Sequence, residues 1–170
     1  MIYLIIGSIG SGKTTTAKQL ATKLDYEFIE LDEMALSKTG YKTASEAISK
    51  SPLKLKEAEL ESCKELSTKD NIVVVLGGSS VFNRLNFDYF SENAKKKCVV
   101  YLEVDLKTQL ERILSKHSKL ITDKDKVEEN LKKMNLERDF LSNQVCDLKI
   151  STTDFNTSKV IEKIIEAGLS

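Results

Sequence analysis

Eight residues near the start of the chain combine three glycines with a lysine and a hydroxyl side chain. They read Gly7-Ser8-Ile9-Gly10-Ser11-Gly12-Lys13-Thr14 and fit the pattern GxxxxGK[ST]. Glycine permits backbone angles that a side chain would forbid, so successive N–H groups can face inward and enclose phosphate oxygens. Lys13 would place a mobile cation against the β- and γ-phosphates, and the Thr14 hydroxyl would bind the Mg²⁺ that bridges them. The octet therefore predicts a site for a nucleoside triphosphate.

The octet lies where this chemistry needs it, between an apolar run and an amphipathic stretch. Short β-branched runs alternate with Lys- and Glu-rich stretches along the whole chain, a pattern typical of βαβ units around a parallel sheet. Strands are predicted at Ile2–Ile6, Glu27–Leu31, Ile72–Leu76, Cys98–Glu103 and Asp147–Ile150. Helices are predicted at Lys13–Leu24, Leu106–Ser115, Lys126–Leu141 and Ser158–Ala167. The predicted fold class is α/β, a three-layer P-loop NTPase fold with a five-stranded, mostly parallel sheet flanked by helices.

One further helix is predicted to begin at a Ser-Pro pair. Ser51 would cap the helix and Pro52 would occupy its first position. The apolar residues expected on one side of this helix are Leu53, Leu60, Cys63 and Leu66.

Composition favours one globular domain over residues 1–170, since 41% of the residues are hydrophobic and 31% are charged. Lys and Arg total 26 and Asp and Glu total 26, so the net charge is zero, which argues against binding nucleic acid or membrane by bulk charge. No apolar run approaches the roughly 18 residues of a spanning helix, so we expect a cytoplasmic protein. Three scattered Cys and one His suggest neither a disulfide framework nor a zinc site.

Motifs that the chain lacks narrow the class of nucleotide-binding protein. No Asp is followed three residues later by Gly, as in the DxxG motif of GTPases. The strand at Ile72–Leu76 runs into Gly77-Gly78, whereas a motor ATPase would carry an acidic residue there. These absences favour phosphoryl transfer to a small acceptor over switching or mechanical work.

Such a kinase needs a carboxylate near the γ-phosphate to orient or deprotonate the acceptor hydroxyl. Glu30 and Asp32 end the second predicted strand, where a period of two would point both acids the same way. Arg occurs only at Arg84, Arg112 and Arg138, although the chain has 26 basic residues. Because Arg can bind carboxylate or phosphate through two hydrogen bonds, Arg112 and Arg138 are candidate ligand-binding residues.

Together, these residues resemble the shikimate kinase family of small P-loop kinases over nearly the whole chain. Glu30 and Asp32 look like the family's Asp-x-Asp pair, which implies that Glu30 lies near Mg²⁺ and that Asp32 binds the acceptor hydroxyl. Lys56 and Glu59 stand where the family has Phe-Arg-x-x-Glu, so Lys56 would bind the acceptor carboxylate and Glu59 would orient it. Arg138, within a segment similar to Arg-x-Pro-Leu-Tyr, would bind the same carboxylate.

The resemblance also assigns residues on the nucleotide side and at the turn beside the acceptor. Gly77-Gly78-Ser79 looks like the family's triple-Gly turn, so Gly77 and Gly78 would lie against the acceptor. Arg112 matches an Arg near adenine, and Ser151–Asn156 would form the adenine-side loop. With the glycine-rich octet, the implied ATP-binding set is Gly10, Ser11, Gly12, Lys13, Thr14, Thr15 and Arg112.

The chain departs from the family pattern in the lid, placed at about residues 113–125. Ser118–Ile121 stands where the family carries Arg-Pro-Leu-Leu, so the arginine that would meet the phosphates is missing. Lys116 or Lys119 would have to supply that charge, and Lys119 is the predicted catalytic lysine of the lid. Lysine offers a point charge in place of a planar fork.

The leading hypothesis is a kinase that uses ATP and Mg²⁺ to phosphorylate a hydroxyl of a small, anionic metabolite. Residues of about 32–66 would form the helical segment that binds the acceptor. Two alternatives stay open: a kinase of another acceptor, such as a nucleoside, nucleotide, sugar acid or polynucleotide end, and a nucleotide-binding regulatory protein that has lost catalysis. The expected partner is a small molecule, with no membrane and no nucleic acid, and the expected state is a monomer or a weak homo-oligomer.

Overall fold

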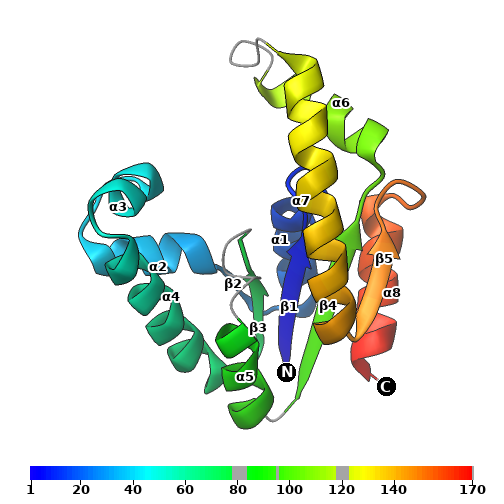
Figure 1. The fold of residues 1–170 in the computed structure, drawn as a ribbon. Helices are drawn as coiled ribbons and strands as arrows, with labels where there is room; N and C mark the ends of the chain where they lie inside the picture. The colour runs from blue at the N-terminus through cyan, green and yellow to red at the C-terminus, as the bar shows by residue number, and fades with distance from the viewer. Residues whose placement is uncertain (78–83, 95, 118–122, 170) are drawn as a thin grey trace.

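Five parallel strands form one sheet at the centre of the molecule (Figure 1). The structure is a computed structural model that describes residues 1–77, 84–94, 96–117 and 123–169. The strands are β1 (Ile2–Gly7), β2 (Glu27–Glu30), β3 (Ile72–Val75), β4 (Lys97–Glu103) and β5 (Leu148–Ser151). Their order across the sheet is β2-β3-β1-β4-β5, so β1 lies in the middle. The predicted α/β class and the five-stranded sheet are confirmed, and every pairing is parallel.

Alternating side chains of the strands supply two separate cores, one on each face of the sheet. On β1, Ile2, Leu4 and Ile6 face one core, while Tyr3 and Ile5 face the other. Strands β3 and β4 divide their residues in the same way, because successive side chains of a strand point to opposite faces. This explains why these strands are almost continuously apolar in sequence.

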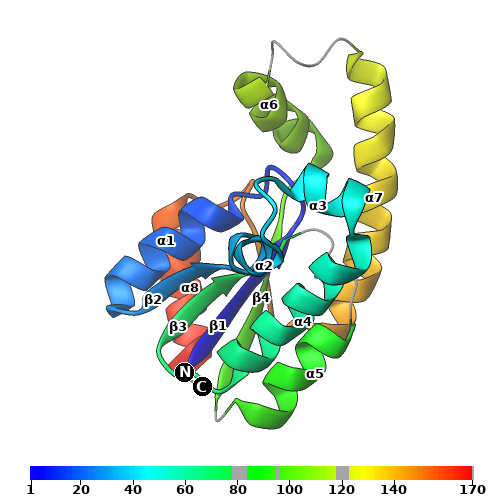
Figure 2. The same ribbon diagram turned by 90° about the vertical axis from the view of Figure 1, so that its left-hand side faces the viewer.

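Helices cover both faces of the sheet (Figures 1 and 2). They are α1 (Lys13–Leu24), α2 (Leu31–Thr39), α3 (Ala44–Lys50), α4 (Pro52–Ser67), α5 (Arg84–Asn93), α6 (Leu106–His117), α7 (Lys124–Val145) and α8 (Thr157–Leu169). Helices α1 and α8 pack on the face that carries Tyr3 and Ile5. Residues of α4, α5 and α7 pack on the opposite face. Among the residues described, no helix is both long and apolar enough to span a bilayer.

Two groups of helices extend beyond the carboxyl end of the sheet. Helices α2, α3 and α4 form an arm on one side, and this arm contains the predicted acceptor-binding segment of about residues 32–66 (Figure 1). Helix α6 and the first half of α7 project on the other side. The glycine-rich octet, which joins β1 to α1, lies between the arm and this projection (Figure 2).

The sequence predicted a helical segment at about residues 32–66 but gave no bounds for α2, α3 or α5, and α2 changes the setting of a site residue. Strand β2 ends at Glu30, and α2 begins at Leu31, so Asp32 lies in the first turn of a helix. The prediction that a strand period of two aligns Glu30 with Asp32 is therefore wrong. Helices α3 and α5 were the other two without predicted bounds; α3 is only seven residues long. Short segments of this kind carry little periodicity of their own.

The start of α4 also differs from expectation in two side chains. Pro52 occupies the first turn as predicted, but Ser51 makes no capping hydrogen bond through its side chain. Its hydroxyl instead lies 3.0 Å from the Tyr41 hydroxyl. Leu53, expected on the apolar side of the helix, is 73% exposed.

Candidate active site

The phosphate-binding loop joins the central strand to a helix through two left-handed glycines. Gly10 and Gly12 have φ angles of 78° and 85°, and Gly12 occupies the N-cap position of α1. Side chains rarely adopt such angles, so the motif's glycines are required here by backbone conformation. The loop is therefore wound as the octet predicted, with the amino end of α1 facing the same space.

Lys13 is held within this loop by backbone oxygens. Its Nζ donates hydrogen bonds to the Gly7 carbonyl at 2.9 Å and to the Ser8 carbonyl at 3.0 Å. Burial, together with the nearby Arg138 charge, lowers the pKa of Lys13 to about 8, while Asp32 and Glu30 oppose that shift. Glu30, Asp32 and Arg138, which come from β2, α2 and α7, thus all lie within electrostatic reach of Lys13.

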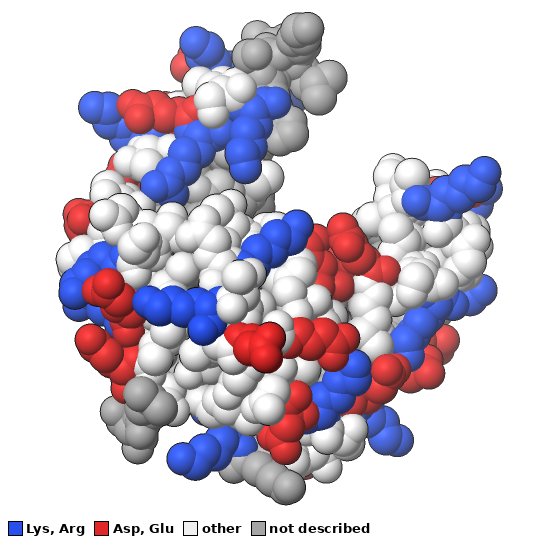
Figure 3. Space-filling model, turned by 180° about the vertical axis from the view of Figure 1, so that it is seen from behind, with Lys and Arg blue, Asp and Glu red and all other residues white. Residues whose placement is uncertain are grey.

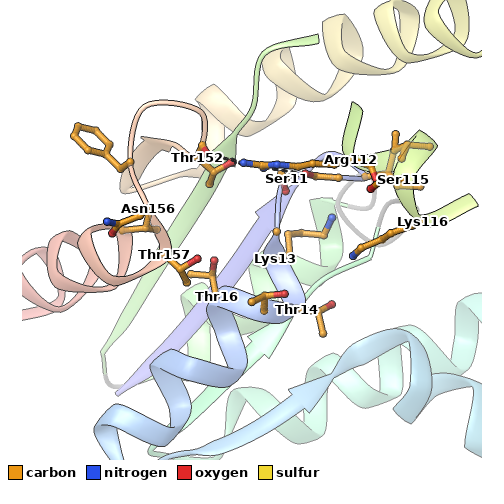
Figure 4. Close-up of a pocket in the computed structure, with 17 residues that line it drawn as sticks. Ser11, Lys13, Thr14, Thr16, Arg112, Ser115, Lys116, Thr152, Asn156 and Thr157 are labelled. Carbon is orange, nitrogen blue, oxygen red and sulfur yellow. Dashed lines mark hydrogen bonds between the residues drawn. The ribbon is translucent and has the colours of Figure 1, made fainter. Parts of the chain in front are cut away.

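A pocket of about 580 Å³ opens beside the loop (Figure 4). Its lining comes from the loop and the start of α1, from α6, and from the segment that connects β5 to α8. The lining residues that carry polar side chains are Ser11, Lys13, Thr14, Thr15, Thr16, Arg112, Ser115, Lys116, Thr152, Asn156 and Thr157. The predicted adenine-side loop, Ser151–Asn156, thus supplies several residues to the pocket that the phosphate loop forms.

Arg112 links the two sides of this pocket. From α6, its Nη1 donates to the Gly10 carbonyl and to the Thr152 hydroxyl, both at 3.1 Å, and its Nη2 donates to the Thr152 carbonyl at 2.8 Å. Figure 4 shows the guanidinium above the loop, with its bonds to Thr152 drawn. The arginine is therefore part of the pocket wall and is fixed in orientation by three hydrogen bonds.

Asp32 and Gly77 lie in direct contact. A Cβ atom at Gly77 would overlap the Asp32 carboxylate, so the carboxylate can occupy its observed position only when residue 77 is glycine. Arg138 is 8% exposed, and burial lowers its pKa, which the nearby Tyr101 opposes. Asp32, Gly77, Arg138 and Lys13 thus gather at the carboxyl ends of the strands, where α/β sheets bind ligands.

A sequence profile of shikimate kinases matches residues 9–168. The chain belongs to the shikimate kinase family. It is 29% identical over 163 residues to the shikimate kinase of Halorhodospira halophila, covering 96% of this chain and 90% of that one. It is 30% identical over 158 residues to the shikimate kinase of Wigglesworthia glossinidia brevipalpis, covering 92% and 89%.

The shikimate kinase fold is shared at the level of structure. The shikimate kinase of Acinetobacter baumannii, solved in complex with shikimate, superimposes with a TM-score of 0.78 at 26% identity, over 97% of this chain and 90% of that one. As a member of the family, the chain is an ATP-dependent phosphotransferase that acts on a small molecule.

Several residues that the sequence assigned to a shikimate kinase site keep their roles only as predictions. Lys56 is exposed on α4, whereas Glu59 is 7% exposed. The orientation of Lys56 by Glu59 therefore stays a prediction, with Lys56 at the surface and Glu59 buried below it on the same helix. Gly78 and Lys119 lie outside the described residues.

The lid prediction of about residues 113–125 divides among three segments. Residues 113–117 are the last turns of α6, residues 118–122 lie outside the part of the chain that is described, and α7 begins at Lys124. Lys116, the other predicted substitute for the lid arginine, lines the pocket together with Lys13 (Figure 4). Seen from behind, the surface is deeply notched between the arm and the α6–α7 projection (Figure 3).

Two amide side chains near the loop went unnoticed in the sequence. Gln109 of α6 and Asn135 of α7 contact Ile9 and Ser8 of the phosphate loop. Each amide lies three residues before an arginine of the site, Gln109 before Arg112 and Asn135 before Arg138. Because residues three apart share a helix face, that spacing was a signal that could have identified them.

Proposed function

We propose that this protein transfers the γ-phosphoryl group of ATP to a hydroxyl of shikimate or a closely similar cyclic hydroxy acid. The single observation that carries the proposal is the position of Asp32. Its carboxylate lies against Gly77 and close enough to Lys13 to influence the lysine's pKa. The shikimate bound to the structural relative from Acinetobacter baumannii supports this choice of acceptor.

In the proposed reaction, Asp32 accepts the proton of the acceptor hydroxyl while the oxygen of that hydroxyl attacks the γ-phosphorus. A bond forms between that oxygen and phosphorus, and the bond from phosphorus to the bridging oxygen of the β-phosphate breaks, leaving ADP. Lys13, turned from the Gly7 and Ser8 carbonyls, would stabilise the charge that develops on the phosphoryl oxygens. Lys116, from the end of α6, would add a second positive charge on the same side.

Arg138 is the cation best placed to bind the acceptor's carboxylate. It is buried close to Lys13 and Tyr101, so an anion placed beside it would interact through a poorly screened field. Lys56 would be a weaker, solvent-exposed contributor from the arm. Gly77 gives the acceptor close access to the backbone next to Asp32.

The residues present fit a magnesium ion that is bound together with the nucleotide. No group of three or more His, Cys, Asp or Glu gathers into a metal site among the residues described. Mg²⁺ in kinases uses one or two protein ligands and otherwise phosphates and water. Thr14, on the pocket wall, and Glu30, close to Lys13, would hold it. When bound, the ion would neutralise phosphate charge.

Replacing Asp32 by Asn tests the proposal. We expect Asp32→Asn to lower kcat with shikimate by about 10²- to 10⁴-fold, because proton acceptance is lost, while the Kd of MgATP stays nearly unchanged. The measurement is ADP release against acceptor concentration, with ATP binding followed by calorimetry. Glu33→Gln, which removes an exposed acid from the same helical turn, is the matched control and should keep full activity.

Two results would contradict the proposal. An unaltered kcat in Asp32→Asn would remove Asp32 from its role. MgATP binding by the wild-type protein without any acceptor-stimulated ADP release would favour a nucleotide-binding protein that has lost catalysis.

A further inference from the structure

The four carbonyl groups at the start of the phosphate loop all accept hydrogen bonds from side chains. The Gly7 and Ser8 carbonyls accept from Lys13, the Ile9 carbonyl accepts from Gln109, and the Gly10 carbonyl accepts from Arg112. A phosphate-binding loop needs its N–H groups turned inward, so its carbonyls must be held elsewhere. In this chain the holding groups come from α1 and α6.

Gln109 makes the contact to Ile9 from a fully buried position. Its side chain is 0% exposed, and its Nε2 donates to the Ile9 carbonyl at 2.8 Å. The Gln109 Oε1 accepts from Asn135 Nδ2 at 2.7 Å. Both ends of the amide are thus engaged, which fixes its orientation and directs the N–H group at the loop.

Asn135 extends the same network to the preceding loop residue. Its Oδ1 accepts a hydrogen bond from the Ser8 hydroxyl at 2.7 Å, and Gln109 Nε2 approaches the same oxygen at 3.4 Å. Ser8 is 3% exposed, so water does not readily replace this bond. Two helices, α6 and α7, therefore hold two adjacent loop residues through a pair of amides that bond to each other.

The contacts of Gln109 and Asn135 matter most when Lys13 binds the nucleotide. When Lys13 turns to the phosphates, the Gly7 and Ser8 carbonyls lose their side-chain donor. The contacts of Gln109 and Asn135 do not depend on Lys13 and continue to hold Ser8 and Ile9.

We infer that Gln109 and Asn135 are positioning residues that keep the phosphate loop in its anion-binding conformation. This inference rests on the proposed use of ATP. The amides do not line the nucleotide pocket, so they would act through the loop backbone and affect only the part of the nucleotide that the loop binds. Triphosphate affinity should depend on them, whereas adenosine affinity should not.

The test compares ATP with adenosine in variants of the two amides. Asn135→Ala removes the acceptor of the Ser8 hydroxyl, and Gln109→Glu puts a carboxylate oxygen where an N–H group faced the Ile9 carbonyl. We expect each variant to raise the Kd of MgATP by about tenfold, the usual effect of losing one buried hydrogen bond. The Kd of adenosine and the KM of the acceptor should stay within twofold.

Asn143→Ala supplies the matched control, since Asn143 is an exposed asparagine on the same helix. It should leave every constant unchanged. Circular dichroism and the urea midpoint establish that each variant is folded, and Asn135, only half-buried, provides the tolerant variant if Gln109→Glu fails to fold.

Three outcomes would overturn the inference. An unchanged MgATP affinity in folded Asn135→Ala would show that the network does not support the loop. An equal loss of ATP and adenosine affinity would indicate a general structural role. A wild-type protein that binds no MgATP would overturn the proposed function, and this inference with it, whereas the first two outcomes leave the proposed function intact.

Discussion

At the scale of single residues, Lys13 links the geometry of the site to pH. Burial and the Arg138 charge lower its pKa from 10.5 to about 8 in the protein without nucleotide. The ammonium that phosphates require is then lost as the pH rises through about 8. We expect the Kd of MgATP to rise by up to about tenfold per pH unit above that value, measured by calorimetry from pH 7 to 10.

Two variants of Lys13 check this expectation. Lys13→Arg keeps its charge over this range and should flatten the pH profile of whatever binding it retains. The lysine has a pKa of 10.5 in the unfolded chain and of about 8 in the folded protein, so burying its charge lowers the free energy of unfolding. This destabilisation is complete below pH 8 and decreases as the pH rises from 8 to 10.5. Lys13→Met should therefore raise thermal stability at pH 7 while abolishing MgATP binding. A pH-independent wild-type Kd would contradict the lowered pKa.

Gly77 is a residue at which the neighbouring Asp32 carboxylate leaves no room for a side chain. Gly77→Ala would drive a methyl group into the Asp32 carboxylate, so the carboxylate must move. We expect kcat to fall by about 10²-fold, since small displacements of a catalytic group are costly, with the Kd of MgATP unchanged. Steady-state kinetics at saturating ATP measures the effect.

Gly40→Ala is the control for Gly77→Ala. Gly40 has a φ angle of 78° and open space around it, so alanine there would cost stability through backbone strain without touching the site. Its kcat should match that of the wild-type protein. Full activity in Gly77→Ala would mean that Asp32 tolerates displacement.

At the scale of elements, α5 contributes a fully buried aromatic side chain to the core. Phe90 is 0% exposed and packs within the core between α4, α5 and the sheet. Phe90→Ala should lower the free energy of unfolding by about 3–5 kcal/mol, the usual cost of removing a buried aromatic ring. Urea denaturation measures this loss.

Leu53→Ala provides the comparison on a neighbouring helix, because Leu53 is 73% exposed. Its effect on the free energy of unfolding should stay within about 0.5 kcal/mol. Similar losses in the two variants would contradict the packing described for α5.

Local sequence patterns predicted some elements accurately and others not. Strands β1, β3 and β4 follow from apolar runs in the sequence, and their ends were predicted to within one residue. The start of α2 was missed because its periodicity is weak and because it begins directly after β2, with no intervening turn residue. The consequence was functional, since it is the first turn of α2 that carries Asp32.

At the scale of the whole molecule, Arg112 joins three distant segments of the chain. It lies on α6 and bonds to Gly10 after β1 and to Thr152 after β5. Arg112→Lys cannot reproduce this geometry, because an ammonium lacks the planar fork of donors. We expect the Kd of MgATP to rise by about tenfold, from calorimetry at pH 7.

Lys107→Ala, on an exposed turn of the same helix, should bind MgATP like the wild-type protein. If Arg112→Lys bound MgATP equally well, the bonds of Arg112 to Gly10 and Thr152 would not matter to the pocket.

The sequence by itself determined the phosphate loop, the parallel sheet and the nucleotide side of the pocket. Glycines at fixed spacing and apolar runs are local features, and the chemistry that they specify needs only neighbours in the chain. Lys13 and Thr14 line one pocket for this reason, and Arg112, predicted from the family resemblance, lines the same pocket.

Only the tertiary structure decided the rest. It placed Asp32 against Gly77 and brought Gln109 and Asn135 onto the phosphate loop. These relations join residues as much as 127 positions apart in the chain. Such contacts arise when helices pack together, and no local pattern of residue types specifies which side chains will then meet.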